Sequence, residues 1–259
     1  MILSVCITVF SLSAYHIYDY WKETQDSQRQ NDVLIDKAVE TAPQTQQTEN
    51  GQTESAIKPV SETAPITVDF ERLQEENKDI IAWLYCPDTE INYPVVQSKD
   101  NEYYLRRLLD GTWNIAGTLF MDYRNAADCS DLHTIIYGHN MKNNTMFGSL
   151  PKYSKQEYYE EHSVLYLLTP KQNYKVKLIA GYVTPSDSKV YEFEKTKEER
   201  SGLLKTALDN SLFTSGTTVS DEDRLLTLST CSYEYDNARF VLMLSLIHIS
   251  EPTRRVVIS

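Results

Sequence analysis

Three residues of this 259-residue chain have side chains that could perform nucleophilic chemistry together. Cys231 follows the apolar run LLTLST, which predicts a buried strand, and Arg239 opens the next predicted strand. If these two strands pair, they lie about 5 Å apart, so Arg239 could reach a group bound at the sulfur. His139 follows a further apolar run, HTIIYG. Each residue alone also fits an ordinary role, as a small buried thiol, a turn residue or a solvated cation.

The composition excludes several functions. Hydrophobic residues make up 41% of the chain and charged residues 24%, which is typical of a protein that buries a core. A net charge of −12 argues against a nucleic-acid partner, which needs a basic surface. The four cysteines, Cys6, Cys86, Cys129 and Cys231, form no CxxC pair and no zinc-site spacing. We therefore expect no metal and no cofactor. A Cys86–Cys129 disulfide stays open, because nothing in the sequence places the two thiols together.

The N-terminal part predicts a tethered protein. Residues 1–18 are apolar and contain no Asp, Glu, Lys or Arg, and aromatic residues gather at the end of this run, as they do at a membrane interface. Because no small-residue cleavage site follows, we expect a retained membrane anchor. Residues 19–65 are rich in polar side chains and predict a flexible stalk.

The folded domain is expected over residues 66–244. A helical pattern covers 69–84, and Thr196 with Glu199 forms a capping box before a second helix with an apolar stripe. That stripe consists of Leu203, Leu204, Ala207, Leu208 and Leu212. Strands are predicted at 92–96, 118–122, 133–137, 163–169, 174–184, 225–230 and 239–244. In 174–184 the alternation puts Tyr174, Val176, Leu178, Ala180 and Tyr182 on one face. The fold class is therefore mostly β with helices (α+β), with seven or eight strands in a closed or nearly closed barrel.

These motifs resemble a known family. TLSTC (227–231) with Arg239, and IIYGHN (135–140) upstream, look like the sortase signature of a TLxTC motif followed by Arg and preceded by His. The segments INYPVVQSKDNEYYL (91–105), GTLFMDYRN (117–125) and YGHNMKNNTMFGSL (137–150) closely resemble class B sortases. The helix inserted before TLSTC also sits where that class has a long loop helix. The resemblance covers about residues 66–244.

The resemblance implies a cysteine transpeptidase. Cys231 would be the nucleophile, His139 the general acid and base, and Arg239 the residue that stabilises the oxyanion or holds the substrate. It also implies a peptide groove that Tyr191 could touch and that is lined by Asn101, Leu105, Tyr137 and Ser229. The implied partners are secreted proteins with a C-terminal sorting motif similar to NPQTN, and an amine of the peptidoglycan stem or cross-bridge. The implied location is outside the cell, on a single-pass anchor.

Two other interpretations remain. One is a different wall-acting cysteine enzyme, although papain-like peptidases place Cys before His and L,D-transpeptidases carry a Gly beside the Cys, unlike this chain. The other is a catalytically silent, tethered binding module. The sequence of residues 245–259 differs from the family, whose last strand normally ends a few residues after Arg239. Its latter part shows no clear pattern of a helix or strand, so we expect an atypical tail that is foreign to the domain.

Overall fold

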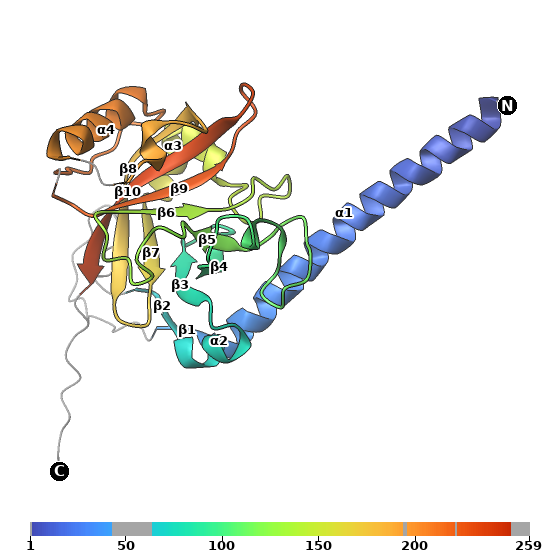
Figure 1. Cartoon of the computed structure of the whole chain (residues 1–259), viewed down its shortest axis with the longest axis horizontal. Helices are drawn as coiled ribbons and strands as arrows, with labels where there is room; N and C mark the ends of the chain where they lie inside the picture. Colours follow the sequence, from blue (N-terminus) through green and yellow to red (C-terminus); the bar gives the residue numbers. More distant parts are fainter. Residues whose placement is uncertain (1, 43–63, 194–195, 221, 250–259) are drawn as a thin grey trace, which may run out of the picture.

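The protein is built around a closed eight-stranded barrel, from which one long helix projects (Figure 1). The computed structural model describes residues 2–42, 64–193, 196–220 and 222–249. The helices are α1 (Ile2–Ala38), α2 (Phe70–Glu76), α3 (Gln156–Glu161) and α4 (Lys197–Asn210), with 3₁₀ turns η1 (Tyr104–Arg106), η2 (Leu150–Ser154) and η3 (Lys189–Tyr191). The strands are β1 (Val39–Thr41), β2 (Ile66–Val68), β3 (Ile80–Tyr85), β4 (Asn92–Val96), β5 (Leu119–Met121), β6 (His133–Tyr137), β7 (Val164–Leu168), β8 (Asn173–Pro185), β9 (Leu225–Cys231) and β10 (Ala238–Ile249). The predicted α+β barrel is confirmed.

The order of strands around the barrel is β10-β8-β7-β3-β4-β5-β6-β9. Strand β9 lies between β6, which runs parallel to it, and β10, which runs antiparallel. Leu226 and Leu228 of β9 belong to the interior core. Because side chains alternate along a strand, Ser229 and Cys231 lie on the outer face.

The predicted helix over residues 69–84 is wrong in its second half. Helix α2 begins after Asp69, whose side chain accepts from the backbone N–H of Arg72, and ends at Asn77. The following run IIAWLY is strand β3, which pairs with β4 on one side and β7 on the other. A strand buried on both faces is apolar throughout, so its pattern does not distinguish it from a buried helix.

The prediction that alternate residues of 174–184 lie on one face of a single strand is also wrong. The pairing of β8 with β10 shifts where Met243 faces Ala180 and Leu244 faces Leu178, which leaves Ile179 as an extra residue. Tyr174, Val176 and Leu178 therefore belong to the interior core, whereas Ala180 and Tyr182 belong to an outer cluster. A bulge reverses the alternation in this way.

The inserted helix α4 covers this outer cluster. Its capping box is present, with Thr196 and Glu199 each bonding the backbone N–H of the other. Leu203, Leu204 and Ala207 are buried beside β8 and β10, whereas the predicted stripe members Leu208 and Leu212 are 47% and 48% exposed. The apolar stripe is therefore narrower than its sequence suggests.

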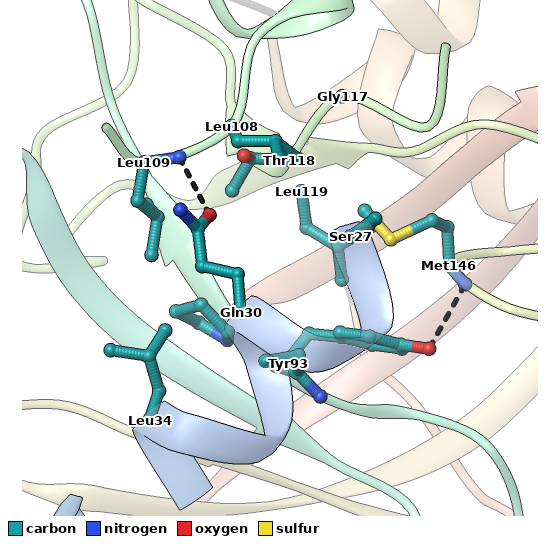
Figure 2. A pocket seen from close by; sticks show the side chains of 12 residues that line it. Ser27, Gln30, Leu34, Tyr93, Leu108, Leu109, Gly117, Thr118, Leu119 and Met146 are labelled. Carbon is teal, nitrogen blue, oxygen red and sulfur yellow. Dashed lines mark hydrogen bonds between the residues drawn. The ribbon is translucent and has the colours of Figure 1, made fainter. Parts of the chain in front are cut away.

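Helix α1 corrects the predicted stalk. Residues 19–38 are helical, and Leu34 and Ala38 are buried against the barrel side. Gln30 accepts from the backbone N–H of Leu109 at 3.1 Å (Figure 2). Asn31 donates to the carbonyl of Asn92 at 3.1 Å. This half of the helix has the same polar composition as a linker, but contacts far away in sequence fix it. The rest of the predicted stalk, 43–63, lies outside the described residues.

The domain boundaries therefore differ from those predicted. Strand β1 pairs with β2, so the folded part includes residues before 66. Strand β10 continues to Ile249 and pairs with β8, so residues 245–249 form part of the last barrel strand. Residues 250–259 lie outside the described part. All four cysteines are free, and Cys86 and Cys129 are buried without forming a disulfide.

Candidate functional site

Three neighbouring strands bring His139, Cys231 and Arg239 side by side. Arg239 is the antiparallel partner of Cys231. On the other side of β9, Tyr137 is the parallel partner of Ser229, so the two residues after it run alongside the end of β9. Figure 1 shows β6, β9 and β10 as neighbours.

Hydrogen bonds hold the ends of these strands together. The backbone N–H of Gly138 donates to the carbonyl of Ser229 at 3.1 Å, and the hydroxyl of Thr230 donates to the carbonyl of Gly138 at 2.8 Å. One residue further on, the side-chain amide of Asn140 donates to the carbonyl of Cys231 at 2.8 Å. His139 lies between these contacts, which sets its backbone next to that of Cys231. The Asn140 contact is one that the sequence did not predict.

The imidazole of His139 is fixed by a loop on the far side of the site. Its Nε2 lies 2.6 Å from the carbonyl oxygen of Leu105. A carbonyl can only accept, so Nε2 carries the proton and Nδ1 is the basic nitrogen. Burial lowers the pKa of His139; the Leu105 bond opposes this shift, and the nearby Arg106 charge adds to it. The ring is therefore neutral at pH 7, which suits it to exchange protons.

A buried carboxylate organises the predicted peptide groove. Asp122 is fully buried and accepts from Asn101 at 3.0 Å, from the Tyr137 hydroxyl at 2.9 Å, and from Arg124 through two bonds of 2.8 Å. Burial alone raises the pKa of Asp122, but the hydrogen bonds from these donors outweigh it and hold the pKa below its usual range. The Asp122 carboxylate is therefore charged and fixes three side chains from separate segments.

Tyr191 closes the same network from the connection between β8 and α4. Its hydroxyl lies 2.8 Å from that of Ser229, and its ring stacks on Tyr137 with centroids 6.3 Å apart. Arg124 donates to the carbonyl of Tyr191 at 3.4 Å. Burial raises the pKa of Tyr191 to about 12, while Arg239 lowers it and Cys231 raises it.

The structure thus gathers all the predicted site residues in one region. Asn101, Tyr137 and Ser229 share the network around Asp122 and Tyr191, and Leu105 contacts His139. Asp122 and Arg124 were not among the predicted site residues. A usable signal was present, because MDYR places an acid at the end of an apolar strand and a base two residues later.

The groups that meet at the ends of the three strands suit acyl transfer. Within the part of the chain that the structure describes, no three His, Cys, Asp or Glu side chains cluster so that they could hold a metal ion. The groups that meet at the strand ends are a half-buried thiol, a neutral imidazole and a guanidinium. A thiol beside a base can act as a nucleophile, and a guanidinium can stabilise an oxyanion.

Comparisons with known proteins agree with this arrangement. The family model described as a sortase domain matches residues 84–247. Sortase B of Listeria monocytogenes is 41% identical over 179 residues, which cover 68% of this chain and 72% of that protein. Among solved structures, a Staphylococcus aureus sortase B–substrate complex has a TM-score of 0.66 at 33% identity, covering 70% of this chain and 85% of that one. A B. anthracis sortase B has a TM-score of 0.70 at 31% identity, covering 90% and 99%. The chain therefore belongs to the sortase family of cysteine transpeptidases, as a sortase of the B type.

Proposed function

We propose that this sortase cleaves a C-terminal sorting motif after its Thr and joins the protein to a cell-wall amine. Nδ1 of His139 takes the proton of the Cys231 thiol, the resulting thiolate attacks the Thr carbonyl carbon, and Arg239 stabilises the oxyanion that forms. The C–N bond then breaks, His139 gives a proton to the departing amine, and a thioester remains. An acceptor amine attacks the thioester while His139 takes its proton. The C–S bond breaks and a new amide is released.

The observation that carries this proposal is the alignment of three neighbouring strands. Arg239 is the direct partner of Cys231, and His139 follows the segment bonded to Ser229. Side chains of residues in register lie about 4.5–5.5 Å apart at Cβ, which is within reach of one scissile amide.

The substrate side of the proposal rests on the groove. We assign peptide contacts to Asn101, Leu105, Tyr137 and Ser229, and expect a motif similar to NPQTN. The acceptor is an amine of a peptidoglycan stem or cross-bridge. In support, one solved sortase B is complexed with triglycine, a peptide that begins with a free amine.

Helix α1 supports the proposed location. Its N-terminal half is long and apolar enough to cross a membrane, and none of that window is buried in the protein. We assign residues 2–18 to a single-pass anchor that holds the barrel outside the cell. The secreted location of proteins with sorting motifs requires this orientation.

The decisive experiment uses a peptide that bears the sorting motif together with an amine acceptor. The unmodified chain should yield both the cleaved peptide and the joined product by mass spectrometry. Cys231→Ala should yield neither, with thermal stability nearly unchanged because this side chain is only half-buried. Cys6→Ala is the matched control, since Cys6 is the exposed thiol farthest from the site in sequence, and it should keep full activity.

The other functions give different outcomes. A hydrolytic cysteine peptidase would cleave the peptide without joining the amine, and a silent binding module would do neither. Transfer by the Cys231→Ala chain would overturn the mechanism.

A further inference from the structure

The exposed tryptophan Trp113 sits on a loop that is fastened to α1. Trp113 pairs with Arg107 across this loop, and its side chain is 60% exposed. The next residue, Asn114, donates from its side chain to the backbone carbonyl of Glu23 at 2.8 Å. The backbone N–H of Ile115 donates to the Glu23 carboxylate at 3.0 Å. The position of Trp113 along the helix axis is therefore set by Glu23.

That position coincides with the end of the apolar half of the helix. Tyr18 and Trp21 are 59% and 57% exposed, and their rings lie 6.1 Å apart. A helix rises about 1.5 Å per residue, so Trp21 lies only about 3 Å along the axis from Glu23. The interfacial layer on each side of a bilayer is about 6 Å thick. The backbone next to Trp113 is therefore held near the level of α1 that Tyr18 and Trp21 mark, although it belongs to the barrel domain.

We propose that the loop of residues 103–113 rests on the bilayer surface, with Trp113 in the headgroup layer. This proposal rests on the assignment of residues 2–18 as a membrane anchor. Tyr103, which is 39% exposed and lies 4.7 Å from the Arg107 guanidinium, adds a second aromatic ring to the same loop. Tryptophan and tyrosine concentrate at membrane interfaces because their rings are apolar and their N–H or O–H groups are polar.

The small net charge of residues 103–113 indicates that their aromatic rings, rather than attraction to anionic lipid, would hold this loop at the headgroup layer. Arg106 and Arg107 are offset in part by Asp110, so residues 103–113 carry a net charge of only about +1. A basic patch that binds anionic lipid contains about four to eight Lys or Arg residues, which is more than this loop has. The contact should therefore form on zwitterionic phosphatidylcholine as well.

This contact would orient the reaction site. Leu105 belongs to the same loop, and its carbonyl holds the imidazole of His139. The His139 side of the site then lies beside the membrane surface. A substrate that is held in the bilayer can bind there without extending far from the membrane.

The three tryptophans of the chain allow a direct test. Trp83 is fully buried and donates to Asn92 at 2.7 Å, so it serves as an internal reference. The full chain with Trp21→Phe is placed in phosphatidylcholine vesicles whose acyl chains are brominated near the glycerol end. Emission from Trp113 should lose intensity relative to unbrominated vesicles and should be shielded from acrylamide in the water. The variant Trp21→Phe/Trp113→Phe should lose no emission to the brominated lipid.

The outcomes separate this proposal from the proposed function. Vesicle flotation reports the anchor, and transfer onto a soluble amine reports the enzyme. A chain that floats but whose Trp113 emission is untouched by bromine overturns the loop contact alone. Shielding from both quenchers overturns it as well, because a peptide or a second copy then covers Trp113. A chain that does not float overturns the anchor and the loop contact together, but not the transpeptidase.

Discussion

At the residue scale, the carboxylate of Asp122 positions the side chains that we propose line the peptide groove. It is fully buried, and three side chains from different segments donate to it. Arg124 links Asp122 to the connection between β8 and α4. Its guanidinium lies 4.2 Å from the Phe193 ring and donates to the Tyr191 carbonyl. Asp122 thus acts on the groove through other residues and is a positioning residue.

We predict that Asp122→Asn raises KM for the sorting peptide about tenfold, which corresponds to about 1.4 kcal/mol. The amide cannot accept from all three donors at once, so Tyr137 and Arg124 lose their fixed positions. The free energy of unfolding should also fall by about 2 kcal/mol, since hydrogen bonds to a charged group are lost. Steady-state kinetics and urea denaturation measure the two effects.

The matched control for this variant is Asp131→Asn. Asp131 lies in the same connection between β5 and β6 and accepts from Asn125 at 2.8 Å and from the backbone N–H of Ala126 at 2.7 Å. It contacts no groove residue among these partners. Stability should fall while KM stays the same. An equal rise of KM in both variants would show that general destabilisation, and not positioning, is responsible.

The pKa of His139 gives a second residue-scale prediction. The positive charge of Arg106 disfavours the imidazolium, so Arg106→Gln should raise the pKa of His139 toward the ordinary value of about 6.5. In a pH titration followed by NMR of histidine ring signals, the midpoint of His139 should move to higher pH. The signal is assigned by its loss in His139→Gln. Arg107→Gln, one position along the chain, should leave the midpoint in place, and an equal shift in both would contradict the assignment.

At the element scale, the connection between β8 and β9 forms the outer wall of the site. Its turn η3 carries Tyr191, and its helix α4 packs on the outer face of the barrel. Arg200 of α4 is buried and donates to the carbonyls of Leu132 at 3.1 Å and Asp223 at 2.7 Å. These bonds tie the helix to the segments just before β6 and β9.

We predict that Thr196→Ala lowers the free energy of unfolding by about 1 kcal/mol, because the hydroxyl of Thr196 caps the Glu199 N–H. Chemical denaturation measures the change. Thr206→Ala in the same helix is the control, since the hydroxyl of Thr206 is exposed and donates to the Gly202 carbonyl within the helix. Its effect should stay within about 0.5 kcal/mol. A loss as large in Thr206→Ala would argue against a specific capping effect.

At the scale of the whole molecule, α1 has two different halves. The first half is apolar and exposed, while the second half is fastened to the barrel through Glu23, Gln30 and Asn31 and buries Leu34. One continuous helix therefore links the proposed anchor to the loop that holds His139. The proposed anchor would orient the barrel relative to a membrane through this helix.

Two truncations should behave differently. Deletion of residues 1–21 should give a soluble protein with unchanged activity on soluble peptides, because the contacts of Glu23 and Gln30 remain. Deletion of residues 1–38 should lower the free energy of unfolding by at least about 3 kcal/mol, since the burial of Leu34 and several hydrogen bonds are lost. Urea denaturation and peptide transfer measure both. Equal stability of the two truncations would contradict a structural role for the second half of α1.

The sequence by itself determined most of the barrel strands and the types of residue at their ends. Residues 133–137 and 225–230 are short apolar runs bounded by polar residues, and the cap at Thr196 is a local signal. Such patterns depend on a residue and its near neighbours. The motif around Cys231 likewise pointed to the family before any fold was known.

Only the tertiary structure decided which elements became neighbours. The parallel placement of β6 beside β9, the strand identity of β3 and the docking of residues 19–38 all depend on partners far away in the chain. The same holds for Asp122, whose charge is tolerated in the interior because Asn101, Tyr137 and Arg124 converge on it. Burial and hydrogen bonding select such contacts among many possible ones, and that selection is a property of the whole fold.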